Sequence, residues 1–163
     1  MERFLQAKHI IQIDDLTRND IEEIFSLAEY YLQKNKNEVE QKHHLRSFTQ
    51  INVFFENSTR TLASFELAGK KLGGIVQDIR IANSSIQKGE TLIDTALTLN
   101  AMKPNLLVVR HSSSGAVNLL SEKVNCSVLN AGDGSHEHPT QALLDFLTIM
   151  HRKKKKEGLI IAI

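Results

Sequence analysis

The sequence has one cysteine, no long apolar stretch and almost no excess of charge of either sign. The single cysteine, Cys126, excludes an internal disulfide framework and fits a reducing compartment. No run of about 18 apolar residues occurs, and the N-terminus has no apolar core long enough for a signal peptide. The net charge of +1 gives no overall argument for binding nucleic acid or a membrane. We therefore expect a cytoplasmic protein that binds neither.

The hydrophobic pattern predicts strands that alternate with helices. With 163 residues, of which 41% are hydrophobic and 24% charged, the chain suits one folded domain. After a first helix that begins near residue 17, the predicted strands are 51–55, 75–79, 106–109 and 126–129. The helices that follow them are 62–72, 91–102, 116–123 and 139–150. Such alternation predicts an α/β fold, with a four-stranded parallel sheet flanked by helices in a three-layer α/β/α arrangement.

The C-terminal stretch, GLIIAI at 158–163, has the composition of a buried strand. A parallel strand with nothing after it buries poorly and leaves backbone groups unpaired. We therefore expect the chain to be a fragment of a longer protein that ends soon after a domain boundary. The basic run at 152–156 is best interpreted as a solvated helix end, because no aromatic or basic patch accompanies it.

A polar turn between the first strand and the next helix is suited to a small phosphate. It contains Ser58, Thr59, Arg60 and Thr61, so hydroxyl groups, a guanidinium and the N–H groups of a helix N-terminus lie together. Arginine can pair two phosphate oxygens at once. The turn lacks the glycines and lysine of a nucleotide P-loop, so the ligand is expected to be small. The alternative is an ordinary helix cap with a solvated arginine.

Further polar residues follow the other three strands. Lys88 lies in the loop after the second strand, Arg110 ends the third, and His138 and Gln141 follow the fourth. Because ligands of open parallel sheets bind beyond the carboxyl ends of the strands, we expect these residues to lie near the turn. The cations suit a phosphate, and the histidine and the amide suit a neutral polar group beside it.

Each of these residues also has a structural interpretation. Arg110 could be a salt-bridged strand end, Lys88 an ordinary loop lysine, and His138 a capping or packing residue. The His-Glu-His sequence at 136–138 could suggest zinc, but no third ligand is spaced nearby. We therefore predict no metal site, and it is the joint placement at four strand ends that favours a binding site.

Several stretches resemble the signatures of the aspartate/ornithine carbamoyltransferase family. The stretches similar to its carbamoyl-phosphate signature are FENSTRT at 55–61, SFE at 64–66 and LGG at 72–74. Its second signature is similar to HPTQALLD at 138–145. The stretches that favour the aspartate branch are KGET at 88–91, DT at 94–95, VRH at 109–111 and NAGDG at 130–134. The resemblance spans nearly the whole chain, but only the family's amino-terminal half.

The resemblance implies an enzyme of de novo pyrimidine biosynthesis. Such an enzyme transfers the carbamoyl group of carbamoyl phosphate to the amino group of L-aspartate, with no metal or other cofactor. Residues 1–150 would form the carbamoyl-phosphate-binding domain, and 151–163 a linker and the start of a truncated aspartate-binding domain. The fragment alone is then expected to bind weakly and to transfer little or nothing. The alternatives are another transcarbamylase, for example one that acts on ornithine, and a non-catalytic phosphate-binding or assembly module.

The resemblance also implies roles for individual residues. The residues implied to bind substrate are Ser58, Thr59, Arg60, Thr61, Ser84, Lys88, Arg110, His138 and Gln141. Those implied to be catalytic, as donors to the carbonyl oxygen on which charge develops, are Arg60, Thr61, Arg110 and His138. Gln141 would hold the carbamoyl amide. Ser84 (or Ser85) and Lys88 would complete the site of a neighbouring subunit, in a homotrimer with shared active sites.

Overall fold

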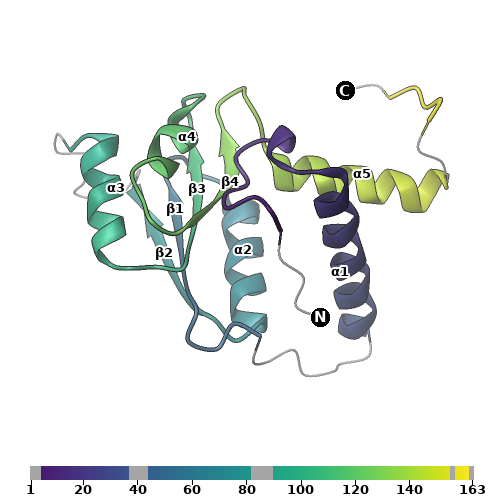
Figure 1. Cartoon of the computed structure of the whole chain (residues 1–163), viewed down its shortest axis with the longest axis horizontal. Coiled ribbons are helices and arrows are strands. Elements are labelled where there is room, and N and C mark those ends of the chain that lie inside the picture. Colours follow the sequence, from purple (N-terminus) through teal and green to yellow (C-terminus); the bar gives the residue numbers. More distant parts are fainter. Residues whose placement is uncertain (1–4, 37–43, 82–89, 155–156, 162–163) are drawn as a thin grey trace.

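The computed structural model of the chain describes residues 5–36, 44–81, 90–154 and 157–161 (Figure 1). Its elements follow the predicted order, a helical start and then four strand–helix units. They are η1 (Ile13–Asp15), α1 (Arg18–Lys36), β1 (Thr49–Phe54), α2 (Thr59–Lys71), β2 (Ile75–Arg80), α3 (Leu92–Ala101), β3 (Leu106–His111), α4 (Ala116–Ser121), β4 (Ser127–Asp133) and α5 (Pro139–Lys153). None of the helices in these ranges is long and apolar enough to cross a membrane.

The strands form one parallel sheet in the order β2-β1-β3-β4. Its register places Val53 of β1 between Ile79 of β2 and Val109 of β3. The N-terminal segment adds to the outer edge of β4, where Ile10 N donates to Val128 O at 2.9 Å. The predicted four-stranded parallel sheet is confirmed.

Helices cover both faces of this sheet (Figure 1). Successive strand residues point to opposite faces, so each apolar strand supplies two cores. One core takes Ala96 of α3 and Leu120 of α4, and the other takes Leu62 of α2. Helix α5 packs beside β4, and α1 packs on α5 through a cluster that contains Phe25 and Leu143. The predicted three-layer α/β/α arrangement is therefore confirmed.

Two helices, α1 and α5, begin within one residue of the positions predicted from the sequence, 17 and 139. Before α1, Thr17 N donates to Asp20 Oδ2 at 2.9 Å, and Asp20 N donates to Thr17 Oγ1 at 3.2 Å. This reciprocal pair satisfies N–H groups that a helix leaves unpaired. Pro139 occupies the first turn of α5, where its missing N–H costs no hydrogen bond. Both starts confirm the sequence-based prediction.

Two segments differ from the prediction. Strand β4 continues through the predicted glycine-rich loop to Asp133, because Asp133 still pairs with His111 of β3 after an irregularity in the register between Val109 and His111. At the other end, residues 157–161 form no strand, and Ile160 is fully exposed. The prediction of a buried strand is wrong for this described part of 158–163. Apolar composition alone does not make a strand where no neighbouring strand pairs with it.

Candidate functional site

The polar turn after β1 leads into the N-terminus of α2. Ser58 occupies the cap position, but its side chain makes no capping hydrogen bond; instead its Oγ donates to Thr61 Oγ1 at 3.0 Å. Thr59 and Arg60 are exposed in the first turn. The alternative interpretation of this turn, an ordinary helix cap, is therefore wrong for the side chain of Ser58. The first-turn N–H groups of α2 have no capping side chain from Ser58, which is the arrangement that suits an anion.

A small hollow of about 50 Å³ lies against this turn. Its lining residues are Phe54, Glu56, Asn57, Ser58, Thr59, Leu62 and Arg80. Arg80, the last residue of β2, brings a second guanidinium to the edge of the turn. Sequence reasoning placed Arg80 at the start of a loop and did not assign it to the site. The only signal available was its position directly after an apolar strand.

Arg110 ends β3 and is held on two sides. Its Nη1 donates to Ala131 O at 2.9 Å, and its Nε lies 2.6 Å from Glu56 Oε1. Nε is buried, and within the described part of the chain it has no hydrogen-bond partner of good geometry. The ion pair with Glu56 is therefore close but poorly aligned. The interpretation of Arg110 as a salt-bridged strand end is thus confirmed. It also fixes the guanidinium at the carboxyl end of the sheet.

Gly132 packs against the guanidinium of Arg110. Its φ of +114° favours glycine, and a Cβ built on it would collide with Arg110 Nη1. The same Cβ would lie 3.6 Å from His138 Cδ2. The glycine therefore allows β4, Arg110 and His138 to approach one another closely.

His138 stands at the cap position of α5 and is partly buried. Its Nδ1 lies 3.3 Å from Thr140 Oγ1. Burial lowers the pKa of His138, the positive charge of Arg110 lowers it further, and Asp145 opposes the shift. The imidazole is therefore neutral at pH 7 and has one N–H to donate.

A larger cavity, of about 280 Å³, joins the start of α2 to the start of α5. Its lining residues are Thr61, Ser64, Phe65, Ala68, His138, Thr140, Gln141 and Leu144. Three of the predicted site residues, Thr61, His138 and Gln141, thus share one cavity. The Gln141 side chain lies at its exposed edge, where Nε2 donates to Asp145 Oδ1 at 2.9 Å.

The predicted site residues fall into three groups. Those that line the two hollows are Ser58, Thr59, Thr61, His138 and Gln141. Arg110 lies beside His138, with Gly132 packed against both, while Arg60 is exposed on the first turn of α2. Ser84 and Lys88 lie outside the described residues.

The other histidines near these strand ends have structural partners. The ring of His111 packs on Phe55 with centroids 4.7 Å apart, and its Nδ1 accepts from Ser113 N at 2.9 Å. His136 Nδ1 lies 3.1 Å from Asp133 Oδ1. Within the ranges that the structure describes, no group of three or more His, Cys, Asp or Glu residues could hold a metal ion.

Comparison with known proteins adds a family match. Residues 8–151 match the model of the aspartate/ornithine carbamoyltransferase carbamoyl-P binding domain. The aspartate carbamoyltransferase catalytic subunit of Pelagibacter ubique is 59% identical over 159 residues, which are 98% of this chain and 51% of that protein. The Cereibacter sphaeroides subunit is 58% identical over 97% of this chain and 49% of its own length. The chain therefore spans about half the length of these curated relatives.

Solved structures of similar proteins share the fold. Aspartate transcarbamoylase from Trypanosoma cruzi, in complex with carbamoyl aspartate and phosphate, superposes with a TM-score of 0.85 at 37% identity. The match covers 94% of this chain and 47% of that one. The catalytic subunit of M. jannaschii aspartate transcarbamoylase gives a TM-score of 0.78 at 40% identity, over 91% of this chain and 48% of that one.

Proposed function

The chain belongs to the aspartate/ornithine carbamoyltransferase family, and we propose that it is the carbamoyl-phosphate-binding half of an aspartate carbamoyltransferase. The enzyme transfers the carbamoyl group of carbamoyl phosphate to the α-amino group of L-aspartate. The products are N-carbamoyl-L-aspartate and phosphate, and the reaction serves pyrimidine biosynthesis in the cytoplasm. Residues 1–150 form the binding domain, and 151–163 are the linker and the start of the aspartate-binding domain. The aspartate acceptor is supported by relatives named aspartate carbamoyltransferase at 58–59% identity.

The observation that carries this proposal is the cavity shared by Thr61, His138 and Gln141. A hydroxyl, an imidazole and an amide there come from the first turns of two helices, next to a turn suited to phosphate. Carbamoyl phosphate needs this combination, because its dianionic phosphate and its neutral carbamoyl group lie only a few bonds apart. Ser58, Thr59 and Arg60 bind the phosphate, and Gln141 holds the carbamoyl amide.

The reaction builds negative charge on the carbonyl oxygen when the amine attacks the carbamoyl carbon. Thr61, Arg110 and His138 donate hydrogen bonds to that oxygen, and Arg60 adds positive charge beside it. Donors that are already oriented stabilise such a charge by about 3 kcal/mol each in comparable sites. A neutral His138 suits this role because its imidazole donates through one N–H without adding charge. The bond between the carbamoyl carbon and the phosphate oxygen then breaks, and that oxygen takes up the proton that the attacking amine loses. Phosphate thus leaves as the hydrogen phosphate dianion, stabilised by the N-terminus of α2.

The remaining groups come from other parts of the assembly. The second half of the enzyme, which the relatives contain and this chain does not span, binds the carboxylates of aspartate. Ser84 and Lys88 belong to a loop that completes the site of a neighbouring subunit, so the active unit is a homotrimer with shared sites. The resemblance of KGET at 88–91 to the aspartate branch supports aspartate as the acceptor.

The binding half of the proposal is tested by titrating the 163-residue chain with carbamoyl phosphate and following backbone amides by NMR. We expect millimolar binding that shifts amides of the first turns of α2 and α5. His138→Ala and Arg60→Ala are expected to weaken it about tenfold or more. Shifts confined to other regions, or none at millimolar ligand, would contradict the proposal.

The transfer half is tested in a hybrid enzyme, in which this chain replaces the matching half of the Pelagibacter relative. A colorimetric assay for the carbamoylated product should detect activity with L-aspartate and not with ornithine. Activity with ornithine would move the chain to the other branch of the family. If transfer survives in a His138→Ala, Arg60→Ala double variant, the chain is an assembly module instead.

A further inference from the structure

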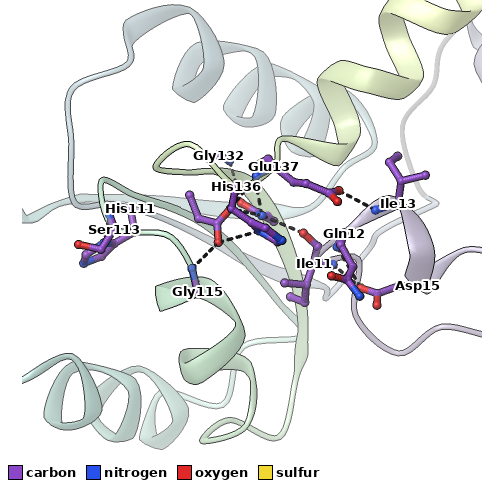
Figure 2. Close-up of polar contacts among 12 residues, drawn as sticks. Ile11, Gln12, Ile13, Asp15, His111, Ser113, Gly115, Gly132, His136 and Glu137 are labelled. Atoms are coloured by element: carbon purple, nitrogen blue, oxygen red, sulfur yellow. Dashed lines mark hydrogen bonds and ion pairs between the residues drawn. The ribbon is translucent and has the colours of Figure 1, made fainter.

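Two polar side chains, Asn130 and Asp133, are fully buried at the end of β4. Neither belongs to the residues proposed to contact substrate. Burial of a carboxylate and an amide is costly unless hydrogen bonds satisfy both groups. The two side chains lie beneath the loop that joins β4 to α5, and Figure 2 shows the labelled residues around them.

Asp133 accepts hydrogen bonds from four directions. The donors are Asn130 Nδ2 at 3.0 Å, Gly115 N at 2.9 Å, Glu137 N at 3.2 Å and His136 Nδ1 at 3.1 Å. Burial alone would raise the pKa of Asp133, but these bonds outweigh it and the pKa lies below its usual value. The carboxylate is therefore ionised, and it links Gly115 at the start of α4 to Glu137 at the end of the loop.

Asn130 extends this set of bonds to the N-terminal segment and to the glycine beside Arg110. Its Nδ2 donates to Ile11 O at 2.8 Å and to Glu137 O at 3.3 Å. Its Oδ1 accepts from Gly132 N at 2.8 Å. Glu137 adds a second link to the same segment, because its Oε2 accepts from Ile13 N at 2.8 Å (Figure 2).

The end of β4 and the loop after it are thus each held at a point that faces the proposed site. Gly132, bonded to Asn130, packs against the Arg110 guanidinium. Glu137, bonded through both its N and its O, directly precedes His138. We propose that the side chains of Asn130, Asp133 and Glu137 act together as positioning residues, which hold Arg110 and His138 where they meet the carbonyl oxygen of carbamoyl phosphate. This inference rests on the proposed function.

The test compares affinities for carbamoyl phosphate and inorganic phosphate, measured by NMR titration of the 163-residue chain. Inorganic phosphate needs only the turn at the start of α2, whereas the carbamoyl group also needs Arg110 and His138. In Asp133→Asn, the new amide NH2 group cannot accept hydrogen bonds from the N–H donors around it, so we expect the loop to move. We expect the preference for carbamoyl phosphate to fall about tenfold, as small misplacements do in active sites, with phosphate affinity changed less than about twofold.

Asp20→Asn is the matched control. Asp20, in the first turn of α1, is also buried, and it accepts hydrogen bonds from Thr17 and Gln6 in the segment before the helix. This variant should keep the preference even if it lowers stability. The inference is overturned if the Asp133→Asn variant folds and keeps the wild-type preference for carbamoyl phosphate over inorganic phosphate.

A milder pair of variants decides the matter if Asp133→Asn does not fold. Glu137→Ala removes only the link to Ile13 and should lower the preference in the same direction, while Glu137→Gln, which keeps an acceptor oxygen, should restore it. An unchanged preference in Glu137→Ala overturns the positioning role. No binding of carbamoyl phosphate by the wild type would instead contradict the proposed function, and this inference with it.

Discussion

Gly132 shows at the scale of single residues how a missing side chain shapes the proposed site. Gly132 and Gly115 both have positive φ, +114° and +82°, so alanine strains the backbone at either position. Only at Gly132 would the new Cβ also collide, with the guanidinium of Arg110, whereas no atom of the described residues lies within 4 Å of a Cβ at Gly115. The pair therefore separates backbone strain from displacement of Arg110.

We expect Gly132→Ala and Gly115→Ala each to lower the free energy of unfolding by about 1–3 kcal/mol. Urea titrations measure this loss. Only Gly132→Ala should also weaken binding of carbamoyl phosphate, because it displaces Arg110. Equal loss of binding in both variants would show that backbone strain alone explains the effect.

His138 gives stability a pH dependence of known sign. Burial and Arg110 lower the pKa of His138 in the folded state below 6.5. The unfolded chain therefore binds this proton first, and folding loses stability as the pH falls from about 6.5 through the lower, folded pKa. Above pH 7 the contribution is fully present.

The measurement compares the wild type with His138→Gln by urea unfolding at pH 7.5 and pH 5.5. The wild type should lose more of its free energy of unfolding between the two. Other histidines with lowered pKa, such as His9 and His111, are present in both proteins and cancel in the comparison. The same loss in both proteins would exclude a shifted pKa at His138.

At the scale of elements, α2 packs so closely on the sheet that there is no room for a side chain at position 69 of the helix, where the residue is glycine. A Cβ on Gly69 would lie 2.5 Å from Gln50 Oε1 and 2.7 Å from Val76 Cγ2. Gln50 cannot move away freely, because its Nε2 donates to Asn52 Oδ1 and to Phe65 O. Close packing of α2 on β1 and β2 holds the phosphate turn at the end of β1.

Gly69→Ala should therefore destabilise the protein by about 1–3 kcal/mol through overpacking, despite a gain in helix propensity of up to about 1 kcal/mol. Ala68→Gly, at the exposed neighbouring position, measures the propensity term alone. Urea unfolding of both variants gives the comparison. A more stable Gly69→Ala would mean that the sheet and α2 can separate without loss.

At the scale of the whole molecule, the proposed site combines residues of two subunits. In the hybrid enzyme, Lys88→Ala and His138→Ala should each abolish most activity. When the two variants are dissociated, mixed and reassembled, about one site in four combines an intact Lys88 with an intact His138. Activity of the mixture should then exceed the sum of the separate variants. No recovery would place both residues in the site of a single subunit.

Sequence alone was sufficient for the alternation of strands and helices and for the starts of α1 and α5, whereas α2 begins at Thr59 and not at the predicted residue 62. Both depend on contacts a few residues apart, such as Thr17 with Asp20 or the proline at the first turn of α5. The family resemblance likewise rests on local stretches. Predictions failed where a segment depends on a distant partner: β4 runs on to Asp133 because that residue pairs with His111 of β3, and residues 157–161 form no strand.

Tertiary structure decided which polar side chains meet. The pairing of Arg110 with Glu56, the contact of Gly132 with Arg110 and the burial of Asp133 all depend on strand order and register. Arg110 lies 54 positions from Glu56 and 22 from Gly132 along the chain, and such residues become neighbours only when the sheet assembles, so no local pattern could predict these contacts. The sequence by itself determined the elements and the residue types at their ends. Packing of the sheet determined the geometry in which those residues can act.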